Sequence, residues 1–296
     1  RIRVVFESSP IGKLNRLCPA IRLQCDDTKV RRLEDQARQI ASEVVSPAEI
    51  LALNPNRQPT TIPKAAVLKP YISEREHGVV FVSFEEQWAR LLNIPNLDDF
   101  VKKYQLVIAP TWCPPHSTFN YLFPRVYPGK IVTTISSPLD LGYLPRISQG
   151  YLPVQLYASS WVNPDLYQPR PHDVRDIDIL MVANFGKYKR HFALFKALSL
   201  IDESLRVVLV GQPDGNRTAD VLMAEAEAYG VADTVELKER VSNDELVELL
   251  CRSRTSIILS KREGSCVAVV ESMFADTPIG ILEEAAIGSK VFVNDQ

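Results

Sequence analysis

Apolar runs and amphipathic stretches alternate along the C-terminal half of the chain. The apolar runs have strand length, whereas the amphipathic stretches have the apolar spacing of helices. Strands that alternate with helices across short loops are typical of a doubly wound parallel sheet. The pattern predicts strands at 177–182, 205–210, 234–237, 256–259 and 278–282, and helices at 191–200, 219–229, from a cap at Asn243 or Asp244 to 250, and at 267–274.

The N-terminal half shows the same alternation less regularly, and we expect a parallel sheet with helical crossovers there as well. A stretch rich in Pro, Asn and Thr at 53–63 is typical of a loop. Residues 159–175 carry three prolines and few apolar repeats, as linkers do. We therefore expect two Rossmann-like domains, residues 1–165 and residues 166–296. The N-terminal pattern predicts strands at 2–6, 65–68, 79–84, 106–109 and 130–135, and helices at 33–45 and 84–92.

Composition narrows the classes of function. The 296 residues are 46% hydrophobic and carry a formal net charge of -2, which argues against nucleic acid as the main partner. Five cysteines without C-x-x-C spacing indicate reduced thiols and a cytoplasmic protein, and they complete no metal site. Neither a signal peptide nor a membrane span is expected. The chain ends just after a strand-like run, so we expect the C-terminal domain to be incomplete.

Two loops at the carboxyl ends of predicted C-terminal strands could carry chemistry. After the strand at 177–182, Lys187, Lys189 and Arg190 precede a helix start, where cations oppose the helix dipole. A bound phosphate would explain them, because helix N-termini favour anions. The alternative is a solvated basic turn.

The loop after the strand at 256–259 brings a carboxylate and a glycine to the same edge of the sheet. Glu263 can accept hydrogen bonds from sugar hydroxyls, Gly264 permits close approach of a ligand, and Ser265 is a good N-cap for the next helix. Glu271 lies within that apolar helix, where burial is costly unless the carboxylate is hydrogen-bonded. A ribose diol would satisfy it. The alternatives are pairing with a nearby arginine, or exposure to solvent.

These segments resemble a known family. The stretches VANFGKYK, VVLVG, TVELKERVSNDELVELL and EGSCVAVVE, with WVNPDLYQP before them, are similar to the C-terminal domain of retaining glycosyltransferases of family 4. The spacing of Glu263 and Glu271 is the most specific part, and the resemblance covers roughly residues 160 to 296. It implies the GT-B fold, in which two Rossmann-like domains face each other across a cleft.

The resemblance also implies roles for individual residues. Glu263 contacts the donor sugar and Lys189 neutralises the leaving nucleoside diphosphate. Asn184 stands where the family usually has an arginine, and Lys187, Arg190 or Arg262 could supply that charge. The further roles implied are ribose binding by Glu271, phosphate binding by amides of Ser265, Cys266 and Val267 beside Gly264, and a wall for the base from the segment that ends at Val241.

The remaining signals are weaker. Asp176 and Asp178 spell D-x-D at the amino end of a strand, away from the ligand side, and are interpreted as surface residues. His116 follows the strand at 106–109 and could face the acceptor, although a capped loop histidine fits equally well. Lys69 follows the strand at 65–68 and could face the acceptor for the same reason. No G-x-G-x-x-G or P-loop motif occurs.

The sequence thus predicts a retaining, metal-independent glycosyltransferase that needs no cofactor and takes a nucleotide-sugar as its donor substrate. The alternative is a catalytically weak or inactive relative that binds the nucleotide-sugar as an assembly partner. A GT-B epimerase is a third hypothesis, but it would want more cleft carboxylates and histidines than this chain offers. No feature identifies the base, the sugar, the acceptor, a membrane contact or an oligomeric state.

Overall fold

The computed structural model describes residues 9–22, 26–44, 46, 48, 50, 65–83, 88, 90–109, 117–136 and 138–293. The chain forms two compact units, Arg1–Leu156 and Tyr157–Gln296. This division lies slightly before the boundary predicted after residue 165. Among the described residues, no helix is long and apolar enough to cross a membrane.

Unit 1 contains a five-stranded sheet with the order β1-β2-β3-β4-β5. The four strands from β2 to β5 are parallel, whereas β1 pairs antiparallel with β2. The predicted parallel arrangement is confirmed for β2 to β5. β1 is antiparallel because residues 70–77 are too few for a crossover and form a hairpin. The strands are β1 (Ala65–Lys69), β2 (Gly78–Ser83), β3 (Tyr104–Ala109), β4 (Ile131–Ile135) and β5 (Tyr151–Gln155).

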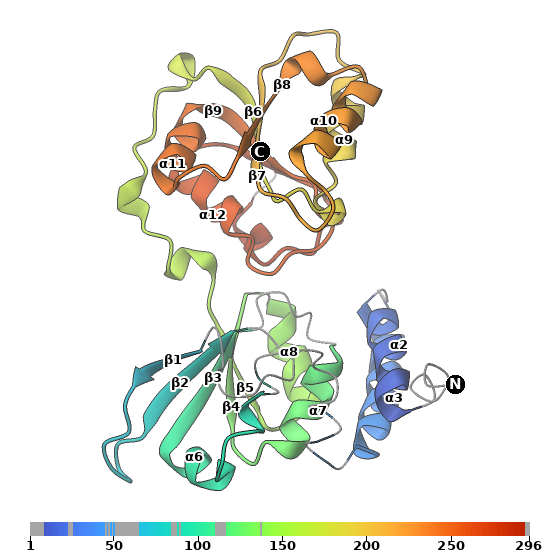
Figure 1. Cartoon of the computed structure of the whole chain (residues 1–296), viewed down its shortest axis with the longest axis vertical. Helices are drawn as coiled ribbons and strands as arrows, with labels where there is room; N and C mark the ends of the chain where they lie inside the picture. Colours follow the sequence, from blue (N-terminus) through green and yellow to red (C-terminus); the bar gives the residue numbers. More distant parts are fainter. Residues whose placement is uncertain are drawn as a thin grey trace. The chain divides into compact units, whose positions relative to one another are not determined.

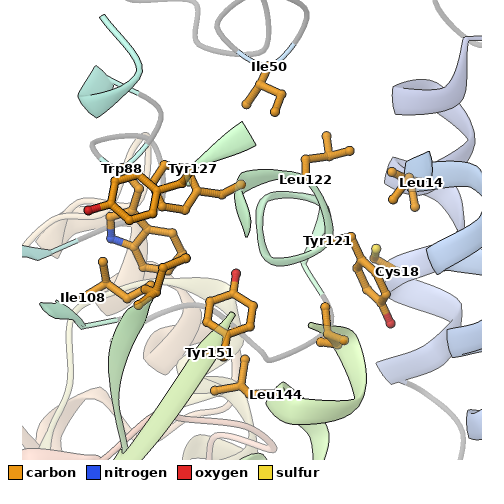
Figure 2. Packing of buried hydrophobic residues seen from close by; sticks show 14 of the residues in the cluster. Leu14, Cys18, Ile50, Trp88, Ile108, Tyr121, Leu122, Tyr127, Leu144 and Tyr151 are labelled. Carbon is orange, nitrogen blue, oxygen red and sulfur yellow. The ribbon is translucent and has the colours of Figure 1, made fainter. Parts of the chain in front are cut away.

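Helices cover one face of this sheet. α7 and α8 lie along β3 to β5, and α2 and α3 pack outside them (Figure 1). Leu14 and Cys18 of α2 face Leu122 and Tyr121 of α7 in a buried apolar cluster (Figure 2). The described helices of unit 1 are α2 (Pro10–Arg22), α3 (Asp27–Ser42), α6 (Leu97–Lys103), α7 (Thr118–Val126) and α8 (Pro138–Ile147).

Sequence reading missed α7, α8 and β5, each of which contains a proline: Pro124, Pro145 and Pro153. Pro124 has no N–H to donate to the carbonyl of Asn120 one turn earlier. The hydroxyl of Tyr151 donates to that carbonyl instead, at 2.9 Å. A distant strand thus compensates for the proline, and no local pattern reveals this. The predicted helix at 33–45 is the C-terminal part of α3, whereas the predicted strand at 2–6 and loop at 53–63 lie outside the described residues.

Unit 2 contains a second five-stranded sheet, wholly parallel, with the order β10-β9-β6-β7-β8. The predicted doubly wound arrangement is confirmed. The strands are β6 (Ile177–Val182), β7 (Val207–Gly211), β8 (Val235–Glu239), β9 (Ser253–Ile258) and β10 (Ile279–Ile281). The helices are α9 (His191–Leu198), α10 (Ala219–Ala228), α11 (Asn243–Arg252) and α12 (Val267–Phe274).

Both faces of the second sheet are covered by helices (Figure 1). Met181 and Leu209 pack with α9 and α10, whereas the neighbouring strand residues Leu180 and Val208 pack with α11 on the opposite face. Successive strand side chains point to opposite faces, so both are buried and the strands read as continuous apolar runs. Ser242, not Asn243 or Asp244, caps α11, because its side chain accepts from the Glu245 N–H at 3.1 Å.

Candidate functional site

The strand order of unit 2 creates a switch point between β6 and β9. From β6 the chain runs through β7 to β8 at one edge, and it then returns to β9 on the other side of β6. The connections that leave β6 and β9 therefore diverge to opposite faces of the sheet. Ligands in open parallel sheets bind in the crevice that opens at such a point. The two loops that the sequence singled out follow these two strands.

Lys189 and Glu263 meet at this switch point. The Lys189 Nζ lies 2.5 Å from the Glu263 Oε1, and the two side chains are only 15% and 10% exposed. The same ammonium lies 5.1 Å from the centre of the Tyr188 ring. The cation predicted to bind phosphate and the carboxylate predicted to bind sugar thus form an ion pair with each other. A ligand anion must share or replace Glu263 as the counter-charge of Lys189.

A short, crowded turn presents Lys189. Lys187–Lys189 form a 3-10 turn after Gly186, where an added Cβ would lie 2.4 Å from the Asp214 Oδ2. Arg190 then adopts φ 62°, the left-handed region, and begins α9 without a side-chain cap. That conformation costs a non-glycine residue roughly 1–2 kcal/mol. Within the part of the chain that the structure describes, the first amides of α9 thus lie beside the lysine without a side-chain cap.

The loop that carries Glu263 is held by the segment 286–289. The Glu263 N–H donates to the Ala286 carbonyl at 3.1 Å, and the Gly288 N–H donates to the Gly264 carbonyl at 2.8 Å. The Ser289 hydroxyl donates to the carbonyl of Ser265. Backbone contacts therefore fix the position of the glutamate.

The prediction that Ser265 caps α12 was wrong. Cys266 is the N-cap residue, at φ 52°, and makes no side-chain capping bond. The Ser265 hydroxyl instead accepts from the Ala158 N–H at 2.8 Å. Among the described residues, α12 therefore begins at Val267 without a side-chain cap.

Cys266 is not poised as a nucleophile. Burial, reinforced by the nearby charge of Glu263, raises the pKa of its thiol to about 12, and Lys189 opposes the shift. A thiol with such a pKa is neutral at physiological pH, and only the thiolate attacks readily. This part of the site therefore offers electrostatics and hydrogen bonding instead of covalent chemistry.

Glu271 is half-buried and thus partly exposed to solvent, and no arginine among the described residues forms an ion pair with it. Burial raises the pKa of its carboxyl group, and a side-chain hydrogen bond from Tyr167 opposes that rise. No described cation forms an ion pair with it within residues 138–293. Tyr167 was missed, because a tyrosine after a linker gives no signal that it reaches α12.

Asn184 is held within its own loop. Its side-chain amide donates to the Tyr188 hydroxyl at 2.9 Å. Of the cations considered as replacements for the family arginine, Lys187 is exposed, whereas the Arg190 guanidinium lies 5.4 Å from the centre of the Phe192 ring. The Arg190 Nε is buried without a hydrogen-bond partner among the described residues.

The next residue, His191, is 1% exposed, and neither ring nitrogen has a hydrogen-bond partner within the described part of the chain. Burial, together with the charge of Arg217, lowers the pKa of this imidazole to about 4. His191 is therefore neutral near pH 7.

The other predicted residues lie elsewhere. Val241 follows β8, two strands along from β6, and packs with the α11 core. Asp176 and Asp178 form ion pairs with Arg206, Arg252 and Arg254 at the amino edge of the sheet, in keeping with their interpretation as surface residues. His116 lies outside the described residues, and Lys69 pairs with Glu76 at 2.9 Å.

Two α/β units with mostly parallel sheets, and a site at the switch point of the second, define the GT-B class of fold. Solved structures support this assignment. Sucrose-phosphate synthase from Thermosynechococcus elongatus aligns over 72% of this chain and 57% of its own, with a TM-score of 0.57 and 17% identity. Anabaena HepE, solved with UDP and glucose, aligns over 73% and 62%, with a TM-score of 0.57 and 13% identity.

The sequence comparison narrows the class to a family. Residues 164–282 match the model of the glycosyl transferases group 1. A GDP-mannose:cellobiosyl-diphosphopolyprenol alpha-mannosyltransferase from Komagataeibacter xylinus is 34% identical over 149 residues, which are 49% of this chain and 36% of that protein. The matched residues all lie in unit 2, so it is unit 2 that is similar to the glycosyl transferases group 1. The chain spans about a third of this relative's length and about 60% of the length of the two solved structures.

Proposed function

We propose that the chain is a retaining glycosyltransferase that moves a sugar from a nucleotide-sugar to an acceptor. The proposal rests above all on the Lys189–Glu263 pair, 2.5 Å apart at the switch point of a group 1 domain. The ammonium of Lys189 can pair with a diphosphate, and the carboxylate of Glu263 can accept hydrogen bonds from sugar hydroxyls. Together they match the two halves of a nucleotide-sugar on either side of the bond that breaks.

The chemistry follows from charge. When a nucleoside diphosphate leaves an anomeric carbon, negative charge grows on the phosphate and positive charge grows on the sugar. Lys189 and the uncapped amides at the starts of α9 and α12 would stabilise the phosphate more as the bond breaks than before it. Glu263 would hold the sugar, and Glu271 would accept hydrogen bonds from the ribose. Gly264 and the amides of Ser265, Cys266 and Val267 would lie along the donor.

A retaining reaction of this type needs no strong protein nucleophile, and the neutral Cys266 thiol is consistent with that route. Lys189 and the amides at the starts of α9 and α12 would neutralise the diphosphate, so we propose that no metal ion takes part. Val241 would contribute to the wall of the base pocket, and His116 would face the acceptor.

The relative from K. xylinus suggests which donor to test first. That protein is named for GDP-mannose, so we propose a hexose carried by a nucleoside diphosphate, with GDP-mannose at the head of the panel. The acceptor is not identified by this comparison. It would bind mainly through unit 1.

A weakly active or inactive nucleotide-sugar-binding relative is the second candidate. It is favoured by Asn184, which stands where the family has an arginine and is hydrogen-bonded to Tyr188. Such a protein would bind donor without turning it over.

A nucleotide panel tests the site. UDP, GDP, ADP, CDP and TDP are titrated by calorimetry, and we expect one of them to bind. If none of the five binds the wild type, the proposed site is wrong. The matching nucleotide-sugar is then incubated with the protein, and release of nucleoside diphosphate is followed.

Turnover separates the two candidates. The transferase is supported if the wild type slowly hydrolyses the donor and Glu263→Gln does not, while the variant binds the nucleoside diphosphate no more weakly than the wild type. Binding with no release by the wild type supports the inactive relative. Glu271→Gln should lower the affinity for the nucleoside diphosphate whichever candidate is correct.

A further inference from the structure

The ammonium of Lys189 must keep its position while its counter-charge changes. Glu263 holds it at 2.5 Å in this structure, but in the proposed function Glu263 accepts hydrogen bonds from the donor sugar. A lysine carries its charge on a long flexible stem, which loses much rotamer freedom when it is fixed. A second group that holds the ammonium without neutralising it would therefore favour the binding of phosphate.

The ring of Tyr188 lies beside that ammonium. The ring centre is 5.1 Å from the Lys189 Nζ, within the range of a cation–π interaction. Neighbouring residues of a helical turn point in different directions, so the lysine side chain must fold back to lie over the ring of the residue before it. The ring attracts the cation through its quadrupole and carries no net charge, so unlike a carboxylate it does not repel an incoming phosphate.

Two contacts hold this ring in place. The Tyr188 hydroxyl accepts from the Asn184 Nδ2 at 2.9 Å and donates to the Asn184 Oδ1 at 3.1 Å. The edge of the ring lies against Gly186, where an added Cβ would be 2.5 Å from the Tyr188 Cε1. A ring fixed at its hydroxyl and at its edge offers its face to Lys189 at little further cost in conformational entropy.

Core packing does not account for an aromatic residue at this position. Tyr188 is 40% exposed, whereas the nearby rings of Phe185 and Phe195 are 0% exposed. A ring exposed to this extent gains less from burial than those two do. The Lys189 side chain beside it is only 15% exposed, so the ring and Glu263 together cover the ammonium.

We propose that Tyr188 is a positioning residue for donor binding, whose ring holds the ammonium of Lys189 in place for the diphosphate when the donor sugar engages Glu263. This inference rests on the proposed function, since it gives Lys189 a diphosphate to bind. Asn184 then serves the site through the Tyr188 hydroxyl, although it brings no charge of its own.

The test changes the electron density of the ring and keeps its shape. Position 188 is replaced by phenylalanine (Tyr188→Phe) and by phenylalanines that carry one, two or three ring fluorines, because fluorine weakens the attraction of the ring face for a cation. Tyr188→Leu removes the ring altogether. Each variant is titrated by calorimetry with whichever of UDP, GDP, ADP, CDP and TDP binds the wild type most tightly.

Tyr229→Leu is the matched control. Tyr229 is 36% exposed, nearly as much as Tyr188, and its ring lies 6.5 Å from that of Phe195 in the same unit. Thermal unfolding confirms that each variant is folded. The fluorinated series keeps the test decisive if Tyr188→Leu fails to fold, because its members have almost the same shape.

We expect Tyr188→Phe to bind the nucleoside diphosphate within about twofold of the wild type, because the ring remains. Affinity should then fall with each added fluorine, by about three- to tenfold over the whole series, and Tyr188→Leu should bind at least as weakly as the last member. Tyr229→Leu should bind like the wild type.

An affinity that stays constant or rises along the fluorinated series would overturn the proposal. A ring that touched the phosphate or stacked on the base would bind as well or better as its electron density falls, because the face of an aromatic ring is negative. A loss in Tyr229→Leu equal to that in Tyr188→Leu would also overturn it. If the wild type binds a nucleotide and the series is flat, only this inference fails, whereas a wild type that binds none of the five nucleotides refutes the proposed function and this inference with it.

Discussion

The ion pair between Lys189 and Glu263 leads to a counterintuitive prediction: the variant Glu263→Gln should bind a nucleoside diphosphate more tightly than the wild type. In the wild type the lysine already has a carboxylate 2.5 Å away, so an incoming phosphate competes with it. Glutamine keeps the size and hydrogen-bonding capacity of the side chain but not its charge. Lys189 would then be free to pair with the phosphate.

The magnitude follows from burial. With side chains 15% and 10% exposed, the pair is shielded from solvent, unlike surface ion pairs. Hydrogen bonds to charged groups contribute about 1.5–3 kcal/mol. We expect the variant to lose about that much free energy of unfolding without ligand. Recovering about half of that free energy on binding would give roughly a four- to tenfold gain in affinity for the nucleoside diphosphate.

Two measurements check this reasoning. Chemical denaturation gives the free energy of unfolding, and calorimetric titration gives the affinity for the diphosphate alone. Glu248→Gln is the matched control, because Glu248 pairs with Arg170 at 2.6 Å but is 46% exposed. Breaking that surface pair should change stability by about 1 kcal/mol or less and leave affinity unchanged. Weaker or equal diphosphate binding by Glu263→Gln would refute competition for the lysine.

Two further outcomes are expected. Gly211→Ala should lower the free energy of unfolding by about 1–3 kcal/mol in urea titrations, because the new Cβ would lie 2.1 Å from the Ala183 carbonyl oxygen, a backbone atom that cannot turn aside. Gly142→Ala, with open space around its Cβ, is the control. The buried imidazole of His191 has a pKa of about 4 in the folded protein, against 6.5 for an unperturbed histidine. The unfolded chain therefore takes up the proton first, and the free energy of unfolding should fall as pH decreases from about 6.5 towards 4. In thermal unfolding, His191→Asn should flatten this dependence of stability on pH, whereas His172→Asn, at an exposed position, should leave it unchanged. An unchanged dependence in His191→Asn would show that His191 is not its cause.

The second sheet could be predicted from sequence because its strands are buried on both faces. Continuous apolar runs such as 207–210, separated by helices of ordinary length, leave few alternative topologies. The same topology predicts that Lys189 and Glu263 lie at one edge of the sheet. Their direct pairing is a matter of side-chain direction, which periodicity does not determine.

Contacts that depend on distant segments could not be predicted. The cap expected at Ser265 was wrong because its hydroxyl binds Ala158, which lies more than a hundred residues earlier. The link from Tyr167 to Glu271 joins an irregular segment to a helix, and neither shows a local signal for the other. α7 was not predicted because Pro124 argues against a helix, and the Tyr151 hydroxyl takes the place of the missing N–H donor. Each failure concerns a polar group whose partner lies far away in the sequence.

The hydrogen bond between Ala158 and Ser265 also bears on the engineering of donor choice. Ala158 is 0% exposed, so its N–H has no access to water if the serine oxygen is removed. An unsatisfied buried donor costs about 1–3 kcal/mol, whatever the replacement does for the donor pocket. A mutant library aimed at new sugars should therefore keep Ser265 and randomise elsewhere in the loop. In such a library, changes at this serine would mix a loss of stability into every measurement of selectivity.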